Sequence, residues 1–131
     1  MAHANVEMVR KAFERFARGE DPDPDAFDPA FEFDNSDGVI DPAVYHGPDG
    51  LDEYRSAMDA MWGEVRFEAL EYIAAGDDTV VMAMRLHAVG ADGTRATENR
   101  TVVFRIRAGR FAQAKAFQNR AAALEAAGVP E

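Results

Sequence analysis

The sequence predicts an α+β fold: a cone-shaped domain in which a strongly curved, mostly antiparallel sheet has about three helices over its concave face. Four long segments of β-type residues follow one another with only short turns between them. Helical segments lie before and after this run. The 131 residues suffice for one hydrophobic core, and no repeat or linker divides them, so one domain is expected over residues 1–131.

The four long predicted strands form the centre of the sheet. They cover Val65–Ala74, Thr79–Val89, Thr94–Arg107 and Phe111–Gln118. Each break between them is short and contains a glycine, and two of the three also contain aspartate, which is typical of chain reversals. Parallel pairing needs a crossover of about a dozen residues or more, so these strands are expected to run antiparallel.

Alternation along the second and third of these strands predicts which face is buried. One face of the second strand carries Val80, Met82, Met84, Leu86 and Ala88. One face of the third carries Val102, Phe104 and Ile106, together with Glu98 and Arg100. The opposite faces hold Arg85, His87, Asn99, Thr101, Arg105 and Arg107. We therefore expect an apolar inner face covered by helices and a polar, arginine-rich outer face.

The remaining elements are three helices and one short strand. Asn5–Arg18 is amphipathic and ends at Gly19, and Ala30–Asp34 is the short strand. A second helix opens at Gly47-Pro48 and has Leu51, Tyr54, Met58, Met61 and Trp62 at helical spacing. Asn119–Ala127 is an alanine-rich final helix. Between the short strand and the second helix, Val39–His46 is irregular and apolar, and such loops often cover the mouth of a pocket.

Composition excludes several classes of function. The formal charge of −10, from 14 basic and 24 acidic residues, argues against nucleic acid or an anionic membrane as a partner. The chain has no cysteine, so disulfides and thiolate metal sites are excluded, and a cytoplasmic location is expected. No apolar run is long enough to cross a membrane. The three histidines lack the spacing of a shared metal site, and no glycine-rich phosphate loop or dinucleotide fingerprint occurs, so no cofactor is expected.

The charges are unevenly distributed. Residues 19–53 contain twelve acids and no lysine or arginine, whereas residues 85–120 contain eight bases and two acids. One interpretation is an ordinary solvated surface. The other is that an arginine-bearing sheet face meets an acidic face, in the same subunit or in a second copy.

A bent sheet and a few helices leave one end of the interior open, so a pocket is expected there. Its predicted walls are Tyr54, Met58, Trp62 and Phe117, which could equally be ordinary core. Glu98 and Arg100 are two apart on a strand, so they face the same way, either as a polar pair in the cavity or as a salt bridge at its rim. His46, in the mouth loop, is a further titratable candidate or a surface histidine.

Five short stretches, spread over nearly the whole chain, resemble a known family. They are Phe31–Asp34, Tyr45–Gly47, Ala75–Asp78, Arg107–Arg110 and Asn119–Gly128. With them the sequence resembles the SnoaL-like branch of the nuclear transport factor 2-like superfamily, which also contains ketosteroid isomerases, polyketide cyclases and limonene epoxide hydrolase. The fold hosts many unrelated activities, so the resemblance specifies fold better than function.

The resemblance implies roles for particular residues. Asp34 matches the position of the general base in the isomerases, where partial desolvation would raise the pKa of its carboxyl. The isomerases also use two oxyanion donors, and their positions hold Ala12 and Val102 here, so steroid isomerisation is not expected. Glu98 and Arg100 loosely resemble the acid and arginine of limonene epoxide hydrolase. Members of the superfamily commonly pair through the exposed sheet face, which implies a homodimer.

Together these features predict a protein that binds an apolar, oxygenated small molecule in an internal cavity. Cofactor-free acid/base chemistry of the isomerase, cyclase or hydrolase type is the accompanying hypothesis, with Asp34 as base, Glu98 and Arg100 as the polar pair and His46 as a further candidate. The alternative is a module for ligand binding or dimerisation that performs no chemistry.

Overall fold

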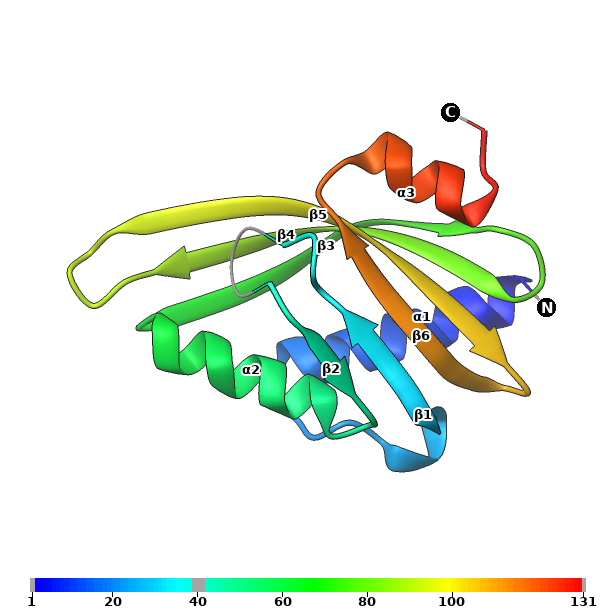
Figure 1. The fold of residues 1–131 in the computed structure, drawn as a ribbon, viewed down its shortest axis with the longest axis horizontal. Helices are drawn as coiled ribbons and strands as arrows, with labels where there is room; N and C mark the ends of the chain where they lie inside the picture. The colour runs from blue at the N-terminus through cyan, green and yellow to red at the C-terminus, as the bar shows by residue number, and fades with distance from the viewer. Residues whose placement is uncertain (1, 39–41, 131) are drawn as a thin grey trace.

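The computed structural model describes residues 2–38 and 42–130. These residues form three α-helices, one short 3-10 helix and six strands (Figure 1). In order they are α1 (Ala2–Ala17), η1 (Pro24–Ala26), β1 (Phe27–Asp34), β2 (Val44–His46), α2 (Gly50–Met61), β3 (Glu64–Ala74), β4 (Thr79–Val89), β5 (Arg95–Arg107), β6 (Arg110–Phe117) and α3 (Arg120–Ala127). None of the described helices is long and apolar enough to cross a membrane.

The six strands form one mixed sheet in the order β2-β1-β6-β5-β4-β3. Strands β3 to β6 are the predicted antiparallel meander, and β2 pairs antiparallel with β1. Only the β1–β6 pair, among the described strands, is parallel. The predicted α+β class with a mostly antiparallel sheet is confirmed. The short strand begins three residues earlier than predicted, and β2 lies in the stretch that was expected to be irregular.

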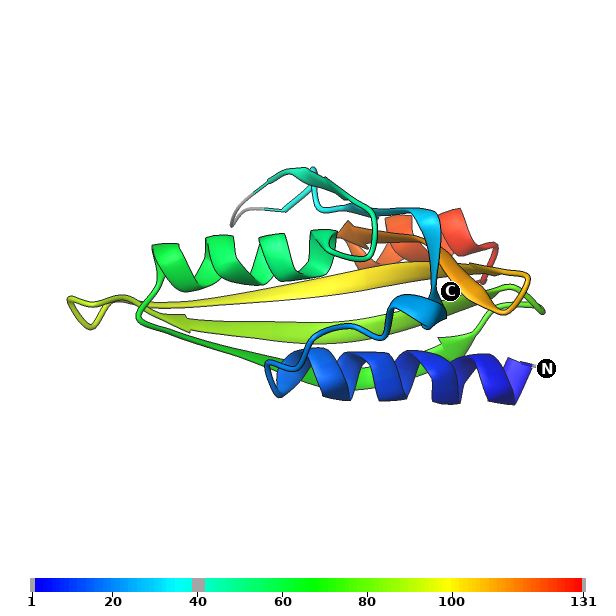
Figure 2. The same ribbon diagram turned by 90° about the horizontal axis from the view of Figure 1, so that it is seen from below.

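The inner face of the sheet packs against α1 and α2. The side chains at the centre of this core come from every layer: Val9, Phe31, Met58, Val80, Met82 and Leu86 are almost fully buried. The predicted alternation in β4 and β5 is confirmed, because Val80, Met82, Met84, Leu86 and Ala88 are buried in β4 and Glu98, Arg100 and Val102 in β5. Seen from below, α1 and α2 run roughly along one direction (Figure 2).

The third helix lies on the opposite face of the sheet, which corrects the expectation of three helices over one face. Ala123 and Leu124 of α3 pack on Val81 and Val103, which point outward from β4 and β5. In Figure 1, α3 lies at the top of the view and the strands separate it from α2. The helix is well bounded, because the Asn119 side chain caps its first turn and Gly128 ends it in a left-handed conformation.

A β-bulge in β6 decides which of its side chains face inward. Phe104 pairs with Ala114, but Ile106 pairs with Phe111, so β6 has one extra residue between these two contacts. An extra residue reverses the alternation along a strand. Phe111, Ala114 and Ala116 are therefore all buried on the inner face, while Lys115 and Phe117 face outward.

Candidate functional site

A cavity of about 70 Å³ lies between the inner face of the sheet and helices α1 and α2. Its walls are mainly aromatic: Phe13, Phe16, Phe27, Phe31, Phe33, Tyr54, Phe67, Phe104 and Phe111. Aliphatic and methionine side chains complete them, including Leu51, Met82, Met84 and Val102. Apolar walls on nearly all sides are typical of a small-molecule site with few polar groups.

Arg100 and Tyr54 supply the only polar side chains among the described residues that line the cavity. Arg100 lies on the inner face of β5 and Tyr54 on the buried side of α2. The Arg100 Nη1 atom donates a hydrogen bond to the Tyr54 hydroxyl over 2.7 Å. Both residues are buried, with Arg100 only 3% exposed and Tyr54 2%.

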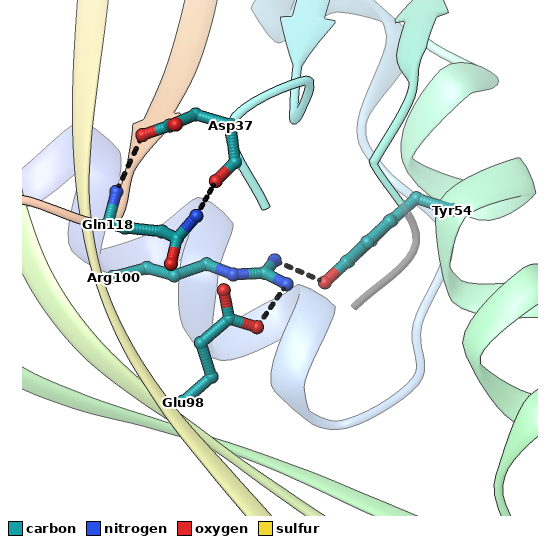
Figure 3. Close-up of polar contacts among 5 residues, drawn as sticks. All are labelled: Asp37, Tyr54, Glu98, Arg100 and Gln118. Carbon is teal, nitrogen blue, oxygen red and sulfur yellow. Dashed lines mark hydrogen bonds and ion pairs between the residues drawn. The ribbon is translucent and has the colours of Figure 1, made fainter. Parts of the chain in front are cut away.

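Glu98 completes this polar cluster. Its carboxylate accepts a hydrogen bond from Arg100 Nη2 over 2.8 Å, and the residue is 9% exposed. Figure 3 shows the guanidinium between the Tyr54 hydroxyl and the Glu98 carboxylate. The contact exists because residues two apart on a strand face the same way. The predicted pairing of Glu98 and Arg100 is thus present, but only Arg100 lines the cavity.

The charge on Arg100 is stabilised by its neighbours. Burial opposes the charged form, but the hydrogen bonds and charges of Glu98 and Tyr54 outweigh it, so the pKa of the guanidinium is raised above its usual value. The ion pair is nevertheless a poor source of folding stability. Desolvating two charges costs several kcal/mol per ion, and apolar residues of similar volume often serve as well or better.

The sheet end near Arg100 is closed by a contact between two loops. The backbone N–H of Gln118 donates to the Asp37 carboxylate over 3.0 Å, and its side-chain amide donates to the Asp37 carbonyl (Figure 3). Gln118 directly follows Phe117, which pairs with Thr101 on β5, so the contact lies level with Arg100. It fixes the loop after β1 against the end of β6.

The cavity adjoins a groove of about 410 Å³ between α1, α2 and residues 20–27. The two spaces share five lining residues: Ala12, Phe16, Phe27, Leu51 and Phe111. These side chains therefore form the wall between the groove and the interior. The mouth was predicted at Val39–His46, but residues 39–41 lie outside the described part of the chain, and none of residues 42–46 lines the cavity.

Asp34 lies on the other face of the sheet. Its carboxylate accepts hydrogen bonds from the backbone N–H and hydroxyl of Ser36, over 2.9 and 2.6 Å, and Lys115 Nζ is 3.9 Å away. The pKa of Asp34 is lowered, and the hydrogen bond from the Ser36 hydroxyl is the largest cause. Together with the backbone N–H of Ser36 and the positive charge of Lys115, it outweighs the effect of desolvation, which raises the pKa. The predicted rise of this pKa was therefore wrong, because polar partners stabilise the ionised form.

The other predicted site residues are dispersed. His46 is exposed on β2, and Phe117 packs beneath α3 on the outer face. Met58 is fully buried in the core but does not line the cavity. Trp62 packs at the margin of the same core, and its indole Nε1 has no hydrogen-bond partner among the described residues. Of the four predicted walls, only Tyr54 lines the cavity.

Phe13 and Phe16 are site residues that the sequence did not single out. Both line the cavity, and Phe16 also borders the groove. Their signal was the aromatic side of the first helix, which is equally typical of an ordinary core. For metals, no group of three histidine, aspartate or glutamate side chains within residues 2–38 and 42–130 could hold an ion together.

Comparison with known proteins identifies the fold and the family. The family sequence model described as a SnoaL-like domain matches residues 9–114 of this chain. The structure of TerC co-crystallised with polyporic acid superposes with a TM-score of 0.70, at 18% identity over 95% of this chain and 98% of that one. An NTF2-like protein of unknown function from Burkholderia pseudomallei gives 0.71, at 21% identity over 92% and 95%.

A protein with a ketosteroid isomerase-like fold from Catenulispora acidiphila, in complex with trimethylamine, gives a TM-score of 0.69 at 17% identity, over 95% of this chain and 94% of that one. Identities this low show the common fold alone. No curated protein matches the chain.

Proposed function

Because the chain belongs to the SnoaL-like domain family, whose fold supports several activities, we propose a function from its site: it binds an apolar small molecule through one oxygen acceptor. The apolar body of the ligand would occupy the aromatic cavity beneath α1 and α2. Its oxygen would accept hydrogen bonds from Arg100 and Tyr54.

The burial of Arg100 at the wall of an apolar cavity carries this proposal. A guanidinium that is 3% exposed has lost nearly all contact with bulk water. The guanidinium is a planar group of N–H donors, and the hydrogen bonds from Nη1 to Tyr54 and from Nη2 to Glu98 hold it at the cavity wall. A ligand oxygen in the cavity would meet a preorganised, charged donor, and such hydrogen bonds are roughly twice as strong as neutral ones.

Two structural relatives support a ligand-binding role, because one was crystallised with polyporic acid and the other with trimethylamine. The size of the cavity limits the class of ligand. About 70 Å³ suits a ring of a few heavy atoms, and a longer molecule would extend past Phe16 into the groove. Small cyclic or aromatic ketones, esters and alcohols fit the size of the cavity and supply the oxygen acceptor.

A thermal-shift screen of such compounds tests the proposal, because a ligand that binds only the folded form raises the melting temperature. The matched variant is Arg100→Met combined with Glu98→Leu, which removes both charges and leaves neither partner buried alone. We expect stabilisation of the wild type by at least one compound and its loss in this variant. If no compound stabilises the wild type, the alternative of a module without a ligand is favoured.

Acid/base chemistry is a second proposal for the same cavity, favoured by the carboxylate of Glu98 beside the donor pair. Arg100 and Tyr54 would stabilise the enolate oxygen of a bound ketone, while the Glu98 carboxylate, which lies behind the cavity wall, would take a proton from the carbon next to the carbonyl through one water molecule and return a proton by the same route. Deuterium exchange into the methyl group of acetophenone, followed by NMR in D2O, measures this step. Glu98→Gln should abolish the exchange, and Asp34→Asn should leave it unchanged.

We also propose a homodimer through the outer sheet face. The supporting observation is that this face presents charged and polar side chains beside α3, including Arg85 with Asn99 and His87 with Glu68. A mixed polar face of this kind suits association between identical copies.

A further inference from the structure

We infer that the cavity selects ligands whose buried end is electrically neutral, such as a ketone, ester or alcohol, over ligands that carry a carboxylate there. This inference rests on the proposed binding function and specifies its ligand class. It follows from how the charge of Arg100 is already compensated.

The charge of Arg100 is balanced inside the protein. Glu98 lies 2.8 Å from the guanidinium, and both side chains are at least nine-tenths buried. Arg100 is the only charged residue among the described residues that line the cavity. The cavity therefore presents hydrogen-bond donors, yet the nearby described side chains carry no net positive charge.

A carboxylate would enter this environment at a disadvantage. It would lose its hydration and become a second anion beside Glu98, so its attraction to Arg100 would be offset by repulsion within a water-poor interior. A neutral carbonyl oxygen loses much less hydration and accepts the same hydrogen bonds. The cavity should therefore bind the neutral ligand more tightly than the carboxylate.

The groove that leads to the cavity does not change this balance. Its lining contains three basic and three acidic side chains, Lys11, Arg15, Arg18, Glu14, Glu20 and Asp23. The Arg18–Glu20 contact is itself an ion pair. The whole chain carries a formal charge of −10, which disfavours the approach of anions further.

Acetophenone and benzoate form a matched pair of probes, because a methyl group in the first replaces one carboxylate oxygen in the second. We expect isothermal titration calorimetry at neutral pH to show acetophenone binding about tenfold or more tightly than benzoate. Equal or tighter binding of benzoate overturns the inference while the binding function stands. If neither probe binds, and no compound of the thermal-shift screen does, the binding function fails and the inference fails with it.

The Glu98→Gln variant tests whether the charge of Glu98 causes this preference for neutral ligands. Without the carboxylate, one negative charge beside Arg100 is lost, so the ratio of the two affinities should move toward benzoate by about tenfold or more. The control is Glu68→Gln, which removes the same charge from the outer face, where Glu68 contacts His87 and is 42% exposed. This control should leave the ratio unchanged. An unchanged ratio in a folded Glu98→Gln protein overturns the inference.

The wild type gives a second test that does not depend on the folding of that variant. If only the neutral acid binds, the affinity for benzoate should rise about tenfold per unit as the pH falls from about 7.5 to about 5.5, since one proton is taken up with each ligand. Acetophenone should bind equally across this range. The described charged and titratable groups at the site are Arg100, Glu98 and Tyr54, while His46 and His87 lie on the outer face. A benzoate affinity that does not change with pH and equals that of acetophenone overturns the inference.

Discussion

The hydroxyl of Tyr54 accepts a hydrogen bond of 2.7 Å from Arg100, which joins α2 to the middle of β5 across 46 positions of sequence. The contact holds the guanidinium at the wall of the cavity and couples the helix that covers the site to the strand that carries its charge. Since both residues line the cavity, a change at this contact should alter folding and the proposed ligand binding together.

Replacing Tyr54 by Phe removes this hydroxyl and keeps the ring that packs against Phe33 at a centroid distance of 5.1 Å. The free energy of unfolding should fall by about 1 to 3 kcal/mol, because a hydrogen bond to a charged group is lost. Urea denaturation measures this loss, and calorimetry should show weaker binding of acetophenone. A variant with unchanged affinity for acetophenone would exclude Tyr54 from the binding site.

Replacing one partner of the Arg100–Glu98 ion pair should destabilise the fold more than replacing both partners. Arg100→Met alone leaves Glu98 buried without its cation and should reduce the free energy of unfolding by about 3 to 5 kcal/mol. Adding Glu98→Leu should restore most of this loss. Chemical denaturation of the single and double variants measures both effects, and a double variant no more stable than the single one would show that the pair itself stabilises the fold.

Asp34→Asn should lower stability in a pH-dependent way. The pKa of Asp34 is lowered in the folded protein, so its charge contributes stability above the unfolded pKa of about 4 and loses that contribution as the pH falls through the folded pKa. We expect an advantage of the wild type of about 1 kcal/mol at pH 7, which disappears in acid. Chemical denaturation from pH 7 down through the folded pKa of Asp34 measures this stability advantage. Asp59→Asn on α2 is the control for losing one charge. Acetophenone binding should not change, because Asp34 lies on the outer face.

Phe16→Ala should join the cavity to the groove. Phe16 borders both spaces and packs edge-to-face on Phe67 at 4.8 Å, so its removal opens the wall between them and costs about 2 to 4 kcal/mol of stability. Calorimetry should show 4-acetylbiphenyl binding more tightly to the variant than to the wild type. Phe13→Ala is the matched control, since Phe13 lines the cavity but not the groove. Equal gains in both variants would place the entrance elsewhere.

The proposed dimer should weaken as salt is added, because its interface would contain charged side chains that salt screens. Sedimentation at micromolar concentration measures the association at low and high ionic strength. Arg85→Glu on the outer face should reduce it, whereas Arg18→Glu near the end of α1 should not. A wild-type monomer at low salt would contradict the proposal.

The sequence predicted the fold well because β4 and β5 are long, at eleven and thirteen residues, and alternate in burial over much of their length. The same rule, applied to Phe31-Glu32-Phe33-Asp34, indicates that Asp34 faces away from the phenylalanines, as the structure confirms. Asp34 was instead assigned to the site by its family position alone.

Phe117 could not be placed from the sequence, because its orientation depends on a bulge that leaves no clear signal in β6. In an unbroken strand Phe111 and Phe117 would face the same way. Phe117 lies at the margin of the outer cluster in which α3 packs on Val81 and Val103. The walls of the cavity could not be predicted from the sequence either. Aromatic residues that line a space and those that fill one have the same helical and strand periodicity.

The extra residue in β6 shows that this hairpin can change its length without exchanging the two faces of the sheet. Deleting Ala112 would remove the bulge and leave Phe111 and Lys115 three positions apart in a regular strand, so the aromatic ring would stay inside and the cation outside. A change of one residue at this hairpin should therefore alter the local twist of β6 and spare the aromatic interior, while the strands on either side keep their order.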